Sequence, residues 1–332
     1  MSRKQEILQC YTEKGICLYE TPEINGIRQY IQIRGADKKA PLMLFLHGGP
    51  GGSMAGLCHV MQPEWEHHFT VVNWDQRNAC KTYLANKSNA AAISQSGTLE
   101  DYMADIDAVI AYLHTVYDFE KIILMGFSWG SLIGAEYAKR HGETVSHYIG
   151  VGQFIHYIDG LHYSCEWLRK VVKDDPADVE KINAFEKSIP DPPQMTPAFM
   201  NSLQGFSKLG AKYIAKDGRA FPIKSLLTSP FLRFGEKMAM VHGNPKLFSG
   251  TYQTMLSHDF RNNLHFDMPV LFVSGDEDFV CPNELLAQHF GQITAPQKKN
   301  VVISKATHTC FYDQPTAFLD TIIDFTSYLN RC

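Results

Sequence analysis

A serine between two glycines is the first feature of this sequence that could do chemistry. Gly126-Phe127-Ser128-Trp129-Gly130 fits the pattern G-x-S-x-G, at the point where a predicted strand passes into a helix. A serine on such a sharp turn is held in a strained backbone conformation with its hydroxyl projecting from the sheet. The following helix N-terminus offers N–H groups to a developing oxyanion. The pattern predicts a nucleophilic serine, although a helix-capping serine between loop glycines would look the same.

A second glycine-rich segment directly follows a predicted buried strand at residues 42–46. It reads His47-Gly48-Gly49-Pro50-Gly51. Such a segment can present a backbone N–H to a substrate carbonyl oxygen and so form half of an oxyanion hole. A plain turn leaving the sheet does not need three glycines, a histidine and a proline in five residues. We therefore interpret the segment as part of a site, with His47 in a structural role.

An acyl-transfer serine needs a base, and the base needs a carboxylate that orients it. Around a serine elbow these groups follow in the order serine, acid, histidine, each after a strand. His308, one of 14 histidines, follows a predicted strand at 301–304. The strand predicted at 270–274 is followed by three acids, Asp276, Glu277 and Asp278. The residues by themselves leave the choice among these acids open.

The elements that must position these groups alternate between strands and helices. In the first half, apolar patterns predict strands at 28–34, 42–46, 69–74, 122–126 and 145–151, with helices at 99–117 and 131–141. The same alternation returns near the end, with strands at 270–274 and 301–304 and helices at 283–290 and 315–329. Alternating strands and helices indicate an α/β fold with a mostly parallel sheet flanked by helices.

Between these two parts the pattern changes. Residues 154–263 are irregular and helical in character, with helices predicted at 161–173, 176–187 and 196–212. We expect one α/β domain, residues 1–152 and 264–332, interrupted by a helical cap insertion, residues 153–263.

Composition excludes several function classes. A net charge of −4 and the lack of a long basic run argue against nucleic acid or an anionic membrane as a partner. Eight cysteines have no paired spacing and are expected to be reduced thiols in a cytoplasmic protein. No metal and no cofactor is expected, because neither ligand spacing nor a phosphate-binding loop is present. We expect a small molecule or a short peptide as substrate, whereas the oligomeric state is not predicted.

The motifs together resemble the proline iminopeptidase family of α/β-hydrolases. The matching segments are His47 to Gly51, Asp75-Gln76-Arg77, Gly126-Phe127-Ser128-Trp129-Gly130-Ser131, Gly275-x-x-Asp278-x-x-x-Pro282 and His308. The resemblance implies the α/β-hydrolase fold with an inserted helical cap. It also implies that Ser128 is the nucleophile, Asp278 the orienting acid and His308 the base. The oxyanion hole would then be formed by the backbone N–H groups of Gly49 and Trp129.

Two departures from the family pattern bear on function. The family continues Asp-Gln-Arg with Gly-x-Gly, whereas this chain has Asn78-Ala79-Cys80. Asparagine tolerates a positive φ, so the turn can survive at Asn78, and Cys80 is the less comfortable replacement. Family peptidases hold the substrate's terminal ammonium with cap glutamates, and some place another glutamate directly after the orienting acid. Here that position is Phe279.

Four cap residues are candidates for substrate binding: Glu166, Glu186, Glu236 and Trp167. The ordinary role of each acid would be a solvated helix face. Three functions therefore remain open. The chain is most like an aminopeptidase that releases an N-terminal residue such as proline. The alternatives are a carboxylesterase or amidase acting on a small uncharged acyl substrate, and a non-catalytic binding protein with a hydrolase fold.

Overall fold

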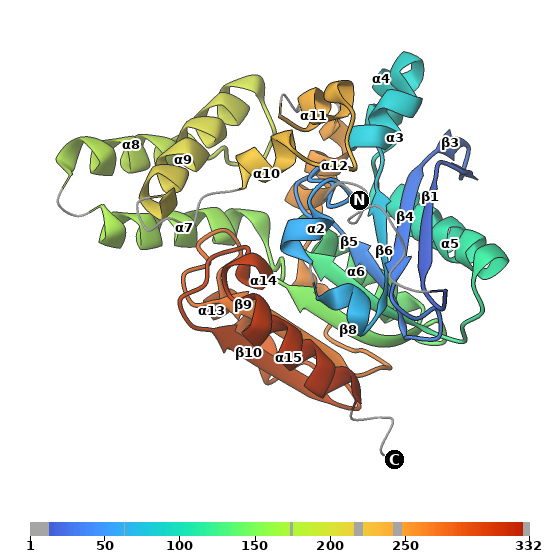
Figure 1. Cartoon of the computed structure of the whole chain (residues 1–332). Coiled ribbons are helices and arrows are strands. Elements are labelled where there is room, and N and C mark those ends of the chain that lie inside the picture. Colours follow the sequence, from blue (N-terminus) through green and yellow to red (C-terminus); the bar gives the residue numbers. More distant parts are fainter. Residues whose placement is uncertain (1–12, 63, 173–174, 216–221, 242–247, 328–332) are drawn as a thin grey trace.

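One eight-stranded sheet runs through the protein in the order β1-β4-β6-β5-β7-β8-β9-β10 (Figure 1). The computed structural model describes residues 13–62, 64–172, 175–215, 222–241 and 248–327. Two of the eight cysteines, Cys10 and Cys332, and the end of the helix predicted at 315–329 lie outside these ranges. The strands are β1 (Ile16–Glu20), β4 (Tyr30–Gly35), β5 (Leu42–Leu46), β6 (Thr70–Asp75), β7 (Ile122–Phe127), β8 (Val145–Val151), β9 (Val270–Gly275) and β10 (Lys298–Ile303). β4 pairs antiparallel with β1 and β6, and the pairs from β6–β5 to β9–β10 are parallel. The predicted mostly parallel sheet is confirmed.

The central strands are apolar throughout because helices cover both faces of the sheet. Along β5, Leu42, Leu44 and Leu46 join one core, whereas Met43 and Phe45 join the other. Successive side chains of a strand point to opposite faces, so a strand buried on both sides needs a continuous apolar run. That is why this strand was predictable to the residue.

Each face has its own set of helices. One core includes residues of α5 (Leu99–Val116), α6 (Trp129–Arg140) and α13 (Asn283–Phe290). The other includes residues of α2 (Cys58–Met61), α14 (Cys310–Asp313) and α15 (Pro315–Ser327). The remaining short elements of the sheet region are β2 (Glu23–Ile24), β3 (Ile27–Arg28), α3 (Cys80–Ala85), α4 (Ala90–Gln95) and the 3-10 helices Trp65–His67, Lys87–Asn89 and Phe260–Asn262.

In the described part of the chain, the α-helices between β8 and β9 are the six that we call the cap. They are α7 (Tyr157–Val171), α8 (Pro176–Lys187), α9 (Pro197–Ala215), α10 (Ile223–Leu227), α11 (Phe234–Val241) and α12 (Ser249–Ser257). The first three share a separate apolar cluster and project from one end of the sheet (Figure 1). The domain boundaries at 152 and 264 stay a prediction.

Differences from the predicted elements have local causes. The helix predicted to begin at residue 131 begins at Trp129 instead, and Ser128 is its N-cap residue. β10 begins three residues before the predicted 301, since its start, Lys298-Lys299-Asn300, lies on an edge strand where polar residues are tolerated. β1 and the short helices α10 to α12 were not predicted.

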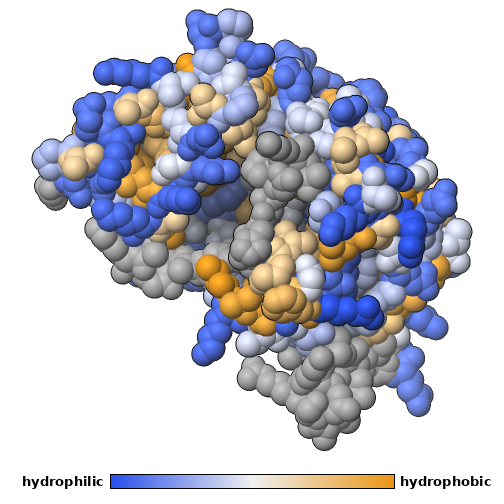
Figure 2. Space-filling view, turned by 90° about the horizontal axis from the view of Figure 1, so that it is seen from above, coloured by the Kyte–Doolittle hydropathy of each residue, from blue (hydrophilic) through white to orange (hydrophobic). Residues whose placement is uncertain are grey.

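The surface over the cap is mixed. Seen from above, apolar residues lie scattered among hydrophilic ones (Figure 2). The most exposed large apolar side chain among the described residues is Phe234 of α11. Among the helices in the described ranges, none has the length and apolarity that crossing a bilayer requires.

Candidate active site

Ser128 lies on the strained turn between β7 and α6. Its backbone has φ +55° and ψ −120°, a conformation that costs a non-glycine residue about 1–3 kcal/mol. The Ser128 N–H donates to the carbonyl of Val151 at 2.9 Å, which ties the turn to the end of β8. A Cβ added at Gly130 would lie 2.0 Å from the Leu46 carbonyl oxygen, so only glycine allows this close approach. The elbow predicted from the pattern is therefore the conformation found.

Asp278 and His308 form a hydrogen-bonded pair. His308 Nδ1 lies 2.9 Å from Asp278 Oδ2, and the Asp278 side chain is buried. The other carboxylate oxygen, Oδ1, accepts the backbone N–H groups of Val280 and Cys281, each at 2.9 Å. A carboxylate held in this way can orient the histidine and stabilise its protonated form.

Asp276, the competing acid, has a different partner. Its Oδ1 accepts the backbone N–H of Ala306 at 3.1 Å, which braces the turn before His308. The structure thus places Asp278, the acid implied by the family resemblance, against the histidine and Asp276 against the backbone.

The three residues follow strands of the same parallel part of the sheet, β7-β8-β9-β10. Ser128 follows β7, Asp278 follows β9 and His308 follows β10. Gly152, at the end of β8, has φ +53°, and a Cβ there would lie 3.0 Å from His308 Cε1 and 3.1 Å from Asp278 Oδ2. The His308 ring also packs on Phe127, the residue before the serine, with centroids 4.8 Å apart. Parallel pairing therefore gathers groups that lie up to 180 positions apart in the sequence.

The segment after β5 passes directly beside the elbow. A Cβ added at Gly48 would lie 3.0 Å from the Ser128 Cβ, and Gly49 lines the same pocket as Ser128. Trp129 is the first residue of α6, and the first N–H groups of a helix have no partner within the helix. The assignment of these two N–H groups to an oxyanion hole stays a prediction.

Gln76 connects the two sides of this candidate oxyanion hole. Its Nε2 donates to the His47 carbonyl at 3.0 Å, and its Oε1 accepts the indole N–H of Trp129 at 2.9 Å. Its backbone N–H donates to His47 Nε2 at 3.2 Å, while burial lowers the pKa of His47 to about 4. His47 is thus a neutral structural residue, as predicted. The role of Gln76 was missed, although its place in the Asp-Gln-Arg motif was the available signal.

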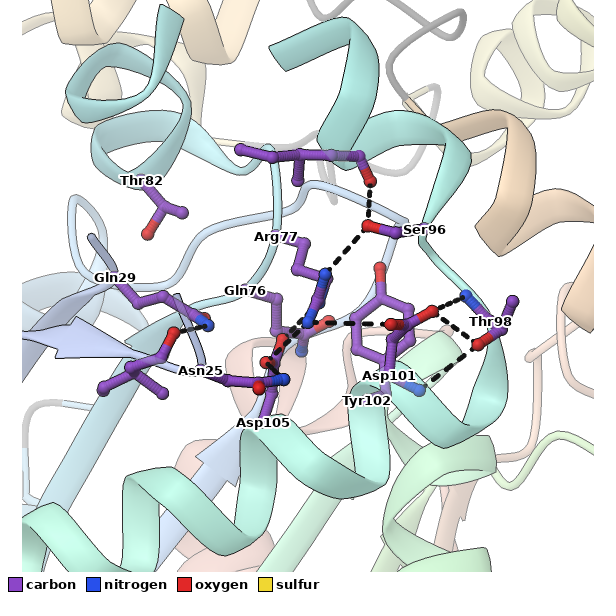
Figure 3. Close-up of polar contacts among 12 residues, drawn as sticks. Asn25, Gln29, Gln76, Arg77, Thr82, Ser96, Thr98, Asp101, Tyr102 and Asp105 are labelled. Atoms are coloured by element: carbon purple, nitrogen blue, oxygen red, sulfur yellow. Dashed lines mark hydrogen bonds and ion pairs between the residues drawn. The ribbon is translucent and has the colours of Figure 1, made fainter. Parts of the chain in front are cut away.

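Arg77, the residue after Gln76, anchors the loop that follows β6 to α5 (Figure 3). Its guanidinium binds both oxygens of Asp105, with Nη2 to Oδ1 at 2.8 Å, and also donates to Ser96 Oγ at 3.0 Å. Asn25 Nδ2 donates to the same carboxylate at 3.0 Å, and burial raises the pKa of Asp105. Paired and hydrogen-bonded in this way, the buried charges hold Gln76 in position.

The two positions where the family has glycine after Asp-Gln-Arg both have left-handed backbone. Asn78 has φ +56° and Cys80 has φ +29°. Asn78 Nδ2 donates to the Ala90 carbonyl at 3.1 Å, which compensates for the conformation. The turn therefore survives both replacements.

A cavity of about 360 Å³ opens at Ser128. Its lining comes from the ends of β5, β7 and β8, the loop after Asp278, and the cap helices α7, α9 and α12. It includes the aromatic residues Phe154, Tyr157, Phe206, Tyr252 and Phe279. No Asp, Glu, Lys or Arg is among its lining residues in the part of the chain that the structure describes.

The four cap candidates lie outside this lining. Glu186 is paired with Arg169 and with His162, whose Nδ1 is 3.3 Å away. Glu166 is exposed on α7, and Glu236 accepts the backbone N–H of Arg233 at 2.6 Å. Trp167 stacks behind Phe279 with ring centroids 4.9 Å apart. Helical spacing could not reveal which side of each cap helix faces the cavity.

Comparisons with known proteins agree with this architecture. Residues 41–315 match the family model described as the alpha/beta hydrolase fold. The Bacillus subtilis protein named "Probable aminopeptidase YbaC" is 25% identical over 331 residues, covering 93% of this chain and 96% of that protein. A proline iminopeptidase of Neisseria gonorrhoeae is 32% identical over 134 residues, 40% of this chain and 39% of its own. The crystal structure of the Mycobacterium smegmatis proline iminopeptidase superposes with a TM-score of 0.66 at 16% identity, covering 93% of this chain and 97% of that one.

Proposed function

Because this chain belongs to the α/β-hydrolase fold family, we propose that it is a serine hydrolase that cleaves an ester or amide through a covalent acyl-enzyme. The observation that carries the proposal is the 2.9 Å contact between His308 Nδ1 and Asp278 Oδ2, beside a strained Ser128 that opens onto the pocket. A binding protein with this fold would not need either the strain or the buried pair.

In the proposed mechanism, Ser128 Oγ attacks the substrate carbonyl while His308 Nε2 takes its proton. Asp278 holds the ring with Nδ1 protonated and stabilises the imidazolium. The N–H groups of Gly49 and Trp129 bind the oxygen of the tetrahedral intermediate. His308 then gives the proton to the leaving group, and water releases the acyl group from Ser128 by the same steps in reverse.

A fluorophosphonate probe tests the nucleophile. We expect one label on Ser128 by peptide mass spectrometry, and Ser128→Ala should abolish labelling and reduce kcat by at least about 10⁴-fold. A label on another residue, or a Ser128→Ala enzyme with a near-normal rate, would contradict the assignment. A folded wild-type protein without label or turnover would instead favour the binding protein.

Aminopeptidase activity is the second candidate, and the similarity to YbaC over 93% of the chain favours it. Such an enzyme would need a carboxylate near the substrate's free amine. Prolyl and alanyl arylamides compared with their N-acetylated forms would reveal it, because blocking the amine would abolish cleavage.

A further inference from the structure

The described residues that line the cavity at Ser128 include several aromatic side chains and no Asp, Glu, Lys or Arg. We propose that this cavity binds an uncharged, apolar acyl group and that Phe279 is the residue that sets this specificity. The inference rests on the proposed serine hydrolase function, since it assigns one side of that reaction to the cavity.

The proton path decides which side of the substrate occupies the pocket. The leaving-group atom has to lie at His308, because it receives its proton there. In the described part of the chain, Ser128 and Gly49 are among the lining residues of the cavity but His308 is not. A substrate whose carbonyl oxygen points toward Gly49 and whose leaving group points toward His308 therefore extends its acyl group into the cavity.

The cavity offers no charge to an ionised acyl group. The only titratable imidazole among its described lining residues, His156, already has Asp159 at 3.1 Å. Apart from Ser128, His156 and the thiol of Cys281, the polar side chains among the described lining residues are hydroxyls and one amide, namely Gln153, Tyr157, Ser164, Ser207 and Tyr252. An ammonium group buried here without a carboxylate would lose its hydration and gain little in return.

Phe279 is held rigidly in this lining. Its ring stacks on Trp167 with centroids 4.9 Å apart and an interplanar angle of 13°. On α9, a Cβ added at Gly210 would lie 2.6 Å from Phe279 Cζ, so the ring packs directly on the helix backbone. The Ser164 hydroxyl donates to the Phe279 carbonyl. With its ring in contact on two sides and its backbone carbonyl bound by Ser164, Phe279 presents a constant apolar wall to the acyl group.

A matched pair of esters tests the charge preference. Leucine p-nitrophenyl ester and 4-methylpentanoate p-nitrophenyl ester differ in the α-amino group, and assays at pH 6, well below the ordinary pKa of about 7.7 for an α-amino group, keep that group protonated. With the Ser128→Ala protein as the blank for spontaneous hydrolysis, we expect kcat/KM to be about 100-fold or more higher for the neutral ester. Equal rates, or a preference for the leucine ester, would overturn the inference.

A second pair of variants tests Phe279 through its contact with α9. In Gly210→Ala the ring has to move away from the helix, and because Trp167 blocks one face it is displaced into the cavity. We expect kcat/KM to fall by about 10-fold for p-nitrophenyl hexanoate relative to acetate. Gly205→Ala on the same helix is the matched control, since its Cβ meets nothing within 4 Å and the helix propensity changes equally. Identical acyl profiles in the two variants would contradict the role of Phe279.

The two proposals fail in different ways. A protein that neither reacts with the fluorophosphonate nor hydrolyses either ester would refute the serine hydrolase itself. A protein that is labelled at Ser128 and prefers the leucine ester would keep the hydrolase and refute the uncharged pocket.

Discussion

Trp129 Nε1 donates a hydrogen bond to Gln76 Oε1 at 2.9 Å, so the residue after Ser128 is tied to the loop that follows β6. The same Gln76 amide reaches the His47 carbonyl at 3.0 Å. One buried side chain thereby links the two backbone segments that carry the proposed oxyanion donors, Gly49 and Trp129. We expect the two hydrogen bonds of Gln76 to fix the distance between these donors, because an oxyanion hole stabilises an anion only when both donors are already in position.

Replacing Gln76 should impair turnover more than binding. Gln76→Met leaves the Trp129 indole and the His47 carbonyl without their partner, and we expect kcat to fall by about 10- to 100-fold with KM changed less than about 3-fold. Steady-state kinetics measures this split. Gln62→Met is the matched control, because Gln62 is equally buried and hydrogen-bonded to Asn73 at 3.3 Å but does not contact the site. Equal kinetic effects in both variants would mean that Gln76 acts only through stability.

Ser128→Gly should stabilise the fold while abolishing activity. The φ of +55° with ψ −120° is strained for serine and accessible to glycine, so relief of strain is expected to add about 1–2 kcal/mol to the free energy of unfolding. Urea unfolding of wild type, Ser128→Gly and Ser128→Ala compares the three. We expect the glycine variant to be the most stable of the three. A lower free energy of unfolding for Ser128→Gly than for Ser128→Ala would argue against strain at the elbow.

The two neighbouring aspartates should differ sharply in catalysis. Asp278→Asn removes the charge that holds His308 Nδ1, and kcat is expected to fall by about 10⁴-fold. Asp276 contacts the Ala306 backbone instead, so Asp276→Asn should cost no more than about 10-fold. A larger loss in Asp276→Asn, measured on the same substrate, would reverse the assignment.

Asp75 should make stability fall as pH rises toward neutrality. It is buried, accepts hydrogen bonds from the Ser53 hydroxyl and the Lys81 N–H, and burial raises its pKa from 3.8 to about 6. Between these two values the folded state binds more protons than the unfolded chain, so this contribution is full below pH 3.8 and is lost as pH rises through 6. The free energy of unfolding of wild type relative to Asp75→Asn should therefore drop by about 3 kcal/mol across this window.

Urea titrations of both proteins from pH 4.5 to 7 should record about 2 kcal/mol of this drop, because the first part of it lies below pH 4.5. The other titrating groups, His47 included, are common to wild type and variant. A difference that stays constant with pH would mean that the carboxyl ionises at its ordinary pKa in the folded protein, and one that grows in favour of wild type would mean that its pKa is lowered there.

Local pattern was sufficient to predict much of the fold and two residues of the candidate site. The strand at 145–151 and the helices at 176–187 and 283–290 have their predicted limits, because apolar periodicity and capping residues act within a few positions. Ser128 and His308 were identifiable for a similar reason, since each directly follows a buried strand and the order of the groups is a property of the chain.

The tertiary structure decided what depends on contacts between distant residues. Asp276 and Asp278 lie two positions apart after the same strand, and only the approach of residue 308 shows which carboxylate meets its imidazole. Gln76 became important because β5, β6 and α6 come together around it. The cap acids had helical spacing compatible with a site, yet the packing of the cap leaves Phe279 at the cavity instead, with its ring against Gly210 of α9. Periodicity tells which residues share a helix face, whereas the neighbour of that face is set by long-range packing.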